Sequence, residues 1–139
     1  MIFSSDRTQL RRMYHDAWQK RLDGTRLTPL EAQIVEVIVL HPEYHRALDD
    51  DNLDRDFLPD DHDPNPYLHM GLHLGLREQL ATDRPAGIKS IYADLCTRLG
   101  DSHDAEHRMI ECLAEILWEA QRTGAPPDEL MYLERLRRL

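Results

Sequence analysis

The spacing of apolar residues along this chain predicts helices and gives no sign of strands. The first apolar series recurs every three or four residues, as one face of an α-helix requires. It consists of Leu10, Met13, Tyr14, Ala17, Trp18 and Leu22. No segment shows a sustained two-residue alternation, which a half-buried strand would need. The pattern therefore predicts an all-α fold.

Capping residues mark where further helices begin and end. Residues 28–31 combine a threonine N-cap, a proline at the first helical position and a capping-box glutamate, so a helix should run from there to residue 41. Asn65 and Pro66 repeat this signal and start a helix to about residue 82. The remaining helices are expected at about residues 42–48, 88–99 and 102–123 and from residue 128 onward, the last with Leu130, Leu133 and Leu136 facing inward. The prediction is one domain, residues 1–139, built as a bundle of about six helices.

The acidic residues gather in one segment, residues 49–65, which we expect to form an acidic surface loop. Residues 49–66 contain eight aspartates and one arginine and carry −7 of the chain's net charge of −9. Such a polar segment cannot bury itself. Read from Asp50 as a calcium loop it fails, because Arg55 stands where the turn needs glycine and Asp61 where a bidentate glutamate is expected.

Composition also bounds the partners and the compartment. An acidic chain is a poor candidate for nucleic-acid binding, which usually needs a basic face. No segment approaches the roughly 20 apolar residues of a membrane span, and residues 1–6 lack the features of a signal peptide. Cys96 and Cys112 are too few and too far apart for a disulfide framework. We expect a cytoplasmic protein without a membrane partner, and the sequence leaves a protein partner or a homo-oligomer open.

One predicted helix carries two histidines a single turn apart, His69 and His73. Side chains at this spacing lie about 6 Å apart, so two imidazole rings can reach one metal ion. A projection at about 100° per residue places Leu72, Leu76 and Leu80 in the same direction as the histidines. We therefore expect both rings to face the core, where burial is unfavourable unless the ring nitrogens are satisfied.

A second pair with four-residue spacing, His107 and Glu111, lies on the helix predicted at 102–123. His45 can add a ligand from a third helix, and His41, at a helix end, is a weaker candidate. The candidate metal site is therefore His69, His73, His107, Glu111 and His45. Nitrogen and oxygen ligands of this kind suit zinc, iron or manganese. The predicted function is a helical metal-binding protein, with a divalent transition metal as its cofactor and no other.

A non-catalytic protein–protein interaction module is the alternative function. It would work through the acidic loop or an apolar helix face, and hydrogen bonds within the protein would satisfy the core histidines. His107 and Glu111 would then form an ordinary surface pair. A nucleophilic enzyme has little support, because the chain lacks a Gly-x-Ser-x-Gly elbow and a glycine-rich phosphate loop. The sequence leaves open whether the protein is an enzyme.

Two glycines, Gly71 and Gly75, lie on the side of the helix opposite the histidines. Each lowers helix stability by about 1 kcal/mol relative to alanine, so some interaction should compensate. We expect the close packing of a neighbouring helix. The close approach of a flat cofactor such as haem is the alternative.

Five segments of the chain carry a family resemblance, namely residues 27–34, 41–45, 65–73, 82–88 and 106–113. Together they resemble a family of short proteobacterial proteins, the domain-of-unknown-function family 1841. The resemblance covers nearly the whole chain and implies a bacterial, single-domain protein. That family has no assigned activity, so the resemblance carries over no catalytic residue.

Hemerythrin-like bundles offer a weaker analogy, because they also use His-x-x-x-Glu and His-x-x-x-His on neighbouring helices. Here the two spacings occur in the other order, and the Glu-x-x-His element of ferritin-like di-iron proteins is absent. These departures favour a mononuclear site over a di-iron centre.

Overall fold

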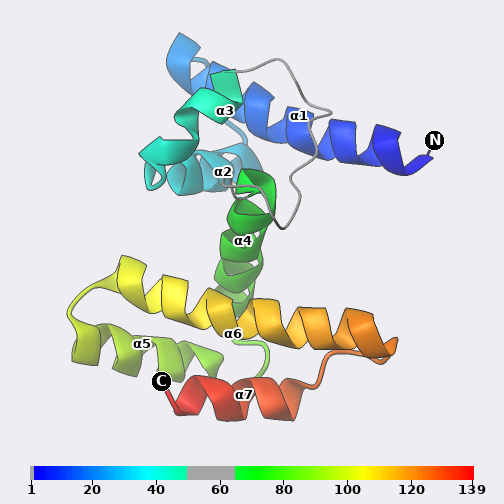
Figure 1. Cartoon of the computed structure of the whole chain (residues 1–139). Helices are drawn as coiled ribbons and strands as arrows, with labels where there is room; N and C mark the ends of the chain where they lie inside the picture. The colour runs from blue at the N-terminus through cyan, green and yellow to red at the C-terminus, as the bar shows by residue number, and fades with distance from the viewer. Residues whose placement is uncertain (1, 50–64) are drawn as a thin grey trace. The chain divides into compact units, whose positions relative to one another are not determined.

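The computed structural model describes residues 2–49 and 65–139 of the chain. These residues form seven α-helices and one 3₁₀ helix, and they contain no strand (Figure 1). The predicted all-α, single-domain fold class is confirmed. The predicted acidic loop, apart from its two end residues, lies outside the described residues.

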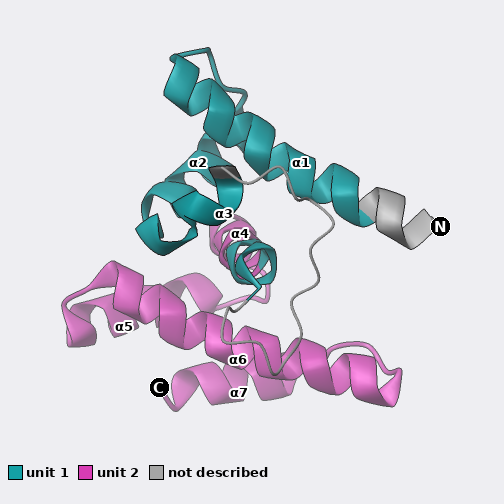
Figure 2. Ribbon diagram, turned by 45° about the horizontal axis from the view of Figure 1, so that its top comes forward, with its two compact units in different colours: residues 1–71 teal, residues 72–139 magenta. Residues whose placement is uncertain are grey.

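The contacts within the chain divide it into two compact units, residues 1–71 and residues 72–139 (Figure 2). The boundary falls inside helix α4 (Pro66–Thr82). This single helix therefore contributes its first residues to unit 1 and the rest to unit 2.

Unit 1 contains α1 (Ile2–Asp23), α2 (Pro29–Val39), the 3₁₀ helix η1 (Pro42–Tyr44) and α3 (His45–Asp49), followed by the start of α4. Helix α1 packs against α2 and α3. The α2 N-terminus has the predicted capping box, in which the Thr28 hydroxyl accepts from Glu31 N and the Glu31 carboxylate accepts from Thr28 N. The predicted N-cap of α4 is confirmed too, since the Asn65 side chain accepts from the backbone N–H groups of Tyr67 and Leu68.

Only part of the apolar series predicted on α1 is buried. Its buried members are Tyr14, Ala17 and Trp18, whereas Leu10, Met13 and Leu22 are exposed. The exposed members are not confined to the ends of the helix, since Met13 directly precedes the buried Tyr14. The spacing therefore located the apolar series but not which of its members are buried.

Unit 2 contains the rest of α4 with α5 (Ile88–Leu99), α6 (Ser102–Thr123) and α7 (Glu129–Arg137). Helices α5, α6 and α7 pack against one another. Their core includes Leu95, Met109 and Leu136 together with Leu76 from α4. On α7, Leu133 and Leu136 face inward as predicted, but Leu130 is exposed and Tyr132 is buried in its place.

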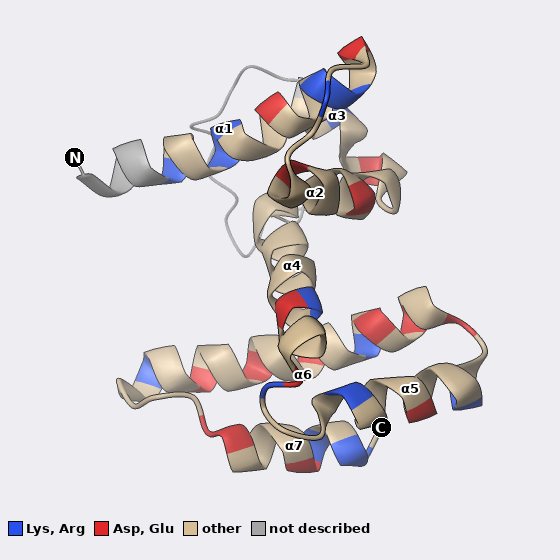
Figure 3. Cartoon of the chain, turned by 180° about the vertical axis from the view of Figure 1, so that it is seen from behind, with Lys and Arg blue, Asp and Glu red and all other residues tan. Residues whose placement is uncertain are grey.

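Charged residues of both signs occur on the helices of unit 2 (Figure 3). Arg135 of α7 pairs with Glu119 of α6 at 2.9 Å and with Glu115 at 3.4 Å. Partly exposed pairs of this kind contribute little to stability one by one. They do link α7 to α6.

Neither glycine of α4 is enclosed as tightly as the sequence suggested. A Cβ atom on Gly71 would lie 3.8 Å from Tyr14 Oη, and one on Gly75 would lie 4.0 Å from Leu113 Cδ2. Neighbouring side chains thus do pack at both positions. The distances are ordinary van der Waals contacts, which a methyl group would also make.

None of the described helices combines the length and the apolarity that a membrane span requires.

Candidate functional site

Helix α4 carries the two histidines that the sequence singled out. His73 is fully buried and belongs to unit 2, whereas His69 is half-buried and belongs to unit 1. Both lie on one uninterrupted helix and are a single turn apart. The helix itself therefore keeps the two side chains on one face.

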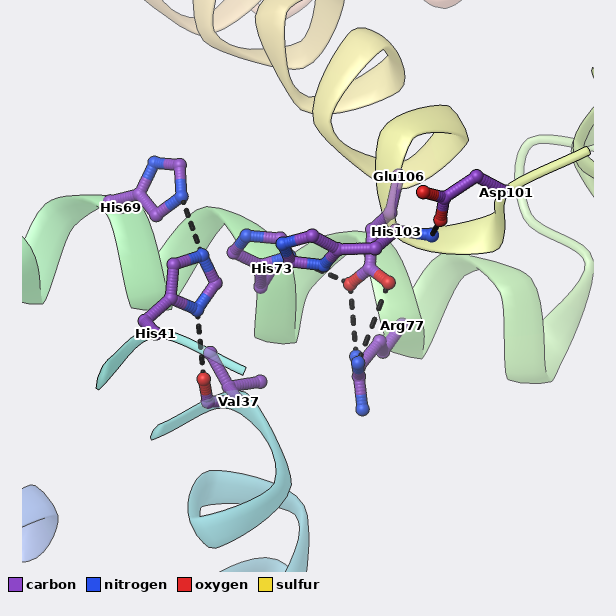
Figure 4. Close-up of polar contacts among 8 residues, drawn as sticks. All are labelled: Val37, His41, His69, His73, Arg77, Asp101, His103 and Glu106. Carbon is purple, nitrogen blue, oxygen red and sulfur yellow. Dashed lines mark hydrogen bonds and ion pairs between the residues drawn. The ribbon is translucent and has the colours of Figure 1, made fainter. Parts of the chain in front are cut away.

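In unit 1 the close neighbour of His69 is His41, which follows the C-terminal end of α2. Their Nε2 atoms lie 3.1 Å apart (Figure 4). His41 is 1 % exposed, and its Nδ1 lies 2.8 Å from the carbonyl oxygen of Val37. Because a carbonyl only accepts, this Nδ1 carries a proton, and in a neutral ring the lone pair then lies on Nε2.

Local sequence places His41 in this position. Leu40 is the C-cap of α2, and Pro42 begins η1 directly afterwards. A proline disfavours the helical conformation in the residue before it, so His41 leaves the helix while its ring still reaches back to the last turn. The last turn of a helix offers carbonyl groups that lack intrahelical partners, and Val37 supplies one of them.

His45 occupies a different environment in unit 1. Its Nε2 donates to the carbonyl oxygen of Ile38 at 2.9 Å. Its ring also packs on the indole of Trp18, with 4.5 Å between the ring centroids. The Nε2 atom of His45 is therefore already hydrogen-bonded to the backbone.

In unit 2, His73 belongs to a buried polar group that joins α4 to α6. Its Nδ1 lies 2.7 Å from Oε1 of Glu106, which is 5 % exposed. Arg77, one turn further along α4, donates from Nε to the same oxygen at 2.9 Å and from Nη2 to Oε2 at 3.4 Å (Figure 4). The carboxylate thus accepts three hydrogen bonds from nitrogen donors.

Burial alone would raise the pKa of the Glu106 carboxyl. Hydrogen bonds from His73 and Arg77, with the positive charge of Arg77, outweigh burial and lower this pKa to about 2. Glu106 is therefore ionised near neutral pH. An ionised carboxylate only accepts hydrogen bonds, so the Nδ1 of His73 must be the donor.

Two further histidines of α6 lie beside His73. The ring centroid of His107 is 4.9 Å from that of His73, and the two rings meet edge to face. The ring of His103 lies 4.1 Å from that of His107 and stacks parallel to that of His73 at 5.9 Å. Asp101 caps α6 by accepting from His103 N, which stabilises the first turn of the helix, where His103 lies.

The candidate residues named from the sequence are not all brought together. Three of them, His69, His73 and His107, are candidate metal ligands together with His41. His41 and His69 are neighbours in unit 1, and His73 and His107 are neighbours in unit 2. Glu111 is exposed, and His45 is bonded to the backbone as described above. A role for Glu111 or His45 as a ligand stays a prediction.

Sequence reasoning gave no role to His103, Glu106 or Arg77, which the structure places in these polar groups. It named His41 but ranked it below His45. The spacing of His103 and His107 equals that of His69 and His73, so this signal could have found His103. The contact between His73 and Glu106 joins residues 33 positions apart, and no local pattern could have found it.

The arrangement provides two imidazoles whose neutral tautomer is set by a hydrogen bond to Nδ1. In both His41 and His73 the Nδ1–H group is bound to an oxygen, and the lone pair of the neutral ring is on Nε2. Metal-binding histidines in proteins have this same outer hydrogen bond, which fixes the tautomer and the ring orientation. The chemistry that these residues can perform is therefore coordination of a metal ion by ring nitrogens.

Comparison with known proteins gives one match. The family model described as "Domain of unknown function (DUF1841)" matches residues 6–138. No curated protein and no solved structure matches the chain.

Proposed function

We propose that this chain, which belongs to the DUF1841 family, is a metal-binding protein. The ligands would be ring nitrogens of His41, His69, His73 and His107. His69 and His73 would contribute from successive turns of α4. His69 has His41 as a neighbour in unit 1, and His73 has His107 as a neighbour in unit 2.

The observation that carries the proposal is the outer hydrogen bond on both buried histidines. His41 donates from Nδ1 to a backbone carbonyl, and His73 donates from Nδ1 to a carboxylate. Each hydrogen bond keeps the proton of the neutral ring on Nδ1, so Nε2 is the atom that can bind a metal ion. The same arrangement in two histidines supports metal binding as their shared function.

The contact between His41 and His69 adds a geometric argument. Two nitrogens bound to one tetrahedral zinc ion at about 2.0–2.1 Å lie about 3.3 Å apart. The two Nε2 atoms lie 3.1 Å apart, close to that separation. Without metal, the same distance suits a hydrogen bond in which His69 donates to His41. Metal binding would then require His69 to move its proton to Nδ1.

The donor type bears on the choice of metal. Imidazole nitrogen suits zinc, iron, nickel and copper, whereas manganese prefers a larger share of oxygen ligands. Among zinc, iron and manganese, an all-histidine set therefore favours zinc or iron(II). If Glu111 joined the set, manganese would become a better fit.

Elemental analysis of untagged protein tests the proposal directly. We expect about one equivalent of a transition metal, and stripped protein should regain stability on adding zinc or iron(II). A ligand at 100 times its dissociation constant stabilises a fold by about 2.7 kcal/mol, which a thermal melt detects. Protein that carries no metal and melts at the same temperature with zinc, iron(II) or manganese would overturn the proposal.

Single substitutions identify the ligands. His41→Gln, His69→Gln, His73→Gln and His107→Gln should each weaken the metal-dependent stabilisation. His45→Gln and Glu111→Gln are the matched controls, because both residues were candidates from the sequence and neither belongs to the group of four. Loss of binding in these controls, with binding intact in His41→Gln, would replace the proposed set by the one read from the sequence.

A protein-interaction module is the second candidate function, and exposed apolar side chains of unit 2 favour it. Trp118 is 62 % exposed and Leu130 is 81 % exposed. In this case the hydrogen bonds of the histidines would serve stability alone. Sedimentation of the metal-free protein over a range of concentrations, with Trp118→Ser as the comparison, separates this function from metal binding. A pull-down with the wild type and with Trp118→Ser is the second test. The interaction function is contradicted if the protein is a monomer at every concentration and the wild type recovers no partner beyond those that Trp118→Ser recovers.

A further inference from the structure

We infer that Glu106 is the positioning residue that selects Nε2 of His73 as the ligand atom, and that Arg77 holds Glu106 in that role. This inference rests on the proposed function. It lies entirely within unit 2, since all three residues belong to the part of the chain from residue 72 onward.

The geometry places Glu106 outside the coordination sphere. Its Oε1 is bound to Nδ1 of His73, and Nδ1 and Nε2 are on opposite sides of the imidazole ring. An ion bound at Nε2 therefore has the ring between itself and the carboxylate. Glu106 would act through His73 and would not be a ligand.

Arg77 explains why the carboxylate keeps this orientation. Its guanidinium contacts both oxygens of Glu106, at 2.9 Å and 3.4 Å. A planar guanidinium bonded to both oxygens fixes the plane of a carboxylate more firmly than a single bond does. With the carboxylate held, the direction of the bond to His73 is held as well.

A buried carboxylate behind a ligand has two separable effects. As an acceptor it fixes the proton on Nδ1, and as an anion it makes the ring a stronger donor toward a metal ion. Glu106→Gln keeps an acceptor oxygen but loses the charge, whereas Glu106→Leu loses both. Comparing the two variants therefore divides the contribution of the charge from that of the hydrogen bond.

The first readout needs no metal. Nitrogen chemical shifts of the His73 ring, measured by NMR on chelator-treated protein, distinguish the two neutral tautomers and the doubly protonated ring. We expect the Nδ1–H tautomer in the wild type and in Glu106→Gln, and a mixture or the other tautomer in Glu106→Leu. A wild-type ring protonated on Nε2 would overturn the inference.

The second readout is zinc affinity, measured by competition with a chromophoric chelator. Replacing an outer-sphere partner typically lowers metal affinity 10- to 100-fold. We expect a loss of about tenfold for Glu106→Gln and a larger loss for Glu106→Leu, with the stoichiometry unchanged. Glu78→Gln is the matched control, because Glu78 is an exposed glutamate of α4 directly after Arg77.

The outcomes separate the two proposals. If the wild type binds no zinc, the proposed function fails, and the His73 tautomer still decides whether Glu106 positions the ring. If the wild type binds zinc but both Glu106 variants bind it with wild-type affinity, the positioning role is overturned and the function stands. Should Glu106→Leu not fold, the tautomer of the wild type and the affinity of Glu106→Gln suffice.

Discussion

The Nδ1 atom of His73 lies 2.7 Å from Oε1 of Glu106, and both side chains are buried. Burial of a carboxylate is unfavourable, and this one is compensated by donors from two residues of α4. The result is a polar connection between α4 and α6 inside unit 2. Its strength can be measured without any metal.

Removing the carboxylate should destabilise the metal-free protein. Glu106→Ala leaves the Nδ1–H donor of His73 without its acceptor and takes from Arg77 its carboxylate partner. Because the Arg77 side chain is 24 % exposed and water can reach it, we expect a loss of about 2–3 kcal/mol, below the range for a fully buried pair. Urea denaturation in the presence of a chelator measures this value.

The control for that experiment is Glu111→Ala, on the same helix but exposed. A surface substitution of this kind usually changes stability by less than about 0.5 kcal/mol. Equal effects of the two substitutions on the free energy of unfolding would mean that the contact between His73 and Glu106 contributes no more to stability than an exposed glutamate does.

The N-cap of α6 gives a second prediction. Asp101 Oδ1 accepts from His103 N at 2.9 Å and from Asp104 N at 3.4 Å. Asp101→Ala should lower the free energy of unfolding by about 1 kcal/mol, whereas Asp101→Asn should retain most of the stability. Asp94→Ala, which removes only an exposed pair with Arg98, should lower it by about 0.5 kcal/mol or less. An Asp101→Ala variant as stable as the wild type would contradict this assignment of the cap.

The helix ends were predictable from the sequence because capping is local. Thr28 with Glu31, and Asn65 with Pro66, are close in sequence, and the structure has both caps where the sequence placed them. The apolar spacing also gave the correct fold class. It did not separate the buried from the exposed members of the α1 series, because the spacing identifies the apolar face of a helix and not which of its residues a neighbouring helix covers.

The candidate site was predictable only in part, for the same physical reason. The pair His69 and His73 is a property of one helix, so its spacing revealed it. The choice between His41 and His45 depends on which ring reaches α4, and no spacing contains that information. The hydrogen-bond partner of His73 is Glu106 of another helix, and no spacing within one helix contains that information.

Two glycines should respond to the same substitution in opposite ways. Gly75 is inside α4, and an added Cβ would lie 4.0 Å from the nearest atom, so Gly75→Ala should stabilise the protein by up to about 1 kcal/mol. Gly100 ends α5 with φ of 72°, a conformation that other residues adopt at a cost. Gly100→Ala should therefore destabilise the protein by about 1 kcal/mol.

Thermal and urea denaturation of both glycine variants check this pair of predictions. Because nothing lies within 4 Å of a Cβ atom added at Gly100, a loss of stability in Gly100→Ala reflects the backbone conformation and not a clash. Destabilisation by Gly75→Ala would show that a neighbouring group approaches α4 more closely than the packing distance indicates, as close packing or a flat cofactor would require.

The capping box of α2 should make stability depend on pH in the acid range. Glu31 is bonded to Lys20 Nζ at 2.7 Å and accepts from Thr28 N at 2.9 Å. The hydrogen bond to Lys20, followed by that to the Thr28 backbone, lowers the pKa of Glu31 from 4.5 to about 2. A carboxylate whose pKa is lower in the folded state stabilises the fold above its unfolded pKa. That contribution is lost as the pH falls from about 4.5 to about 2.

Glu31→Gln isolates this contribution. The difference in unfolding free energy between wild type and variant should be constant near neutral pH, should begin to shrink below pH 4.5, and should reach its lower limit near pH 2. Because the ion pair with Lys20 is partly exposed, 0.5 M salt should reduce the difference. A carboxyl ¹³C titration of Glu31 gives the direct measurement, and a midpoint at the ordinary value of 4.5 would show that neither partner holds the charge.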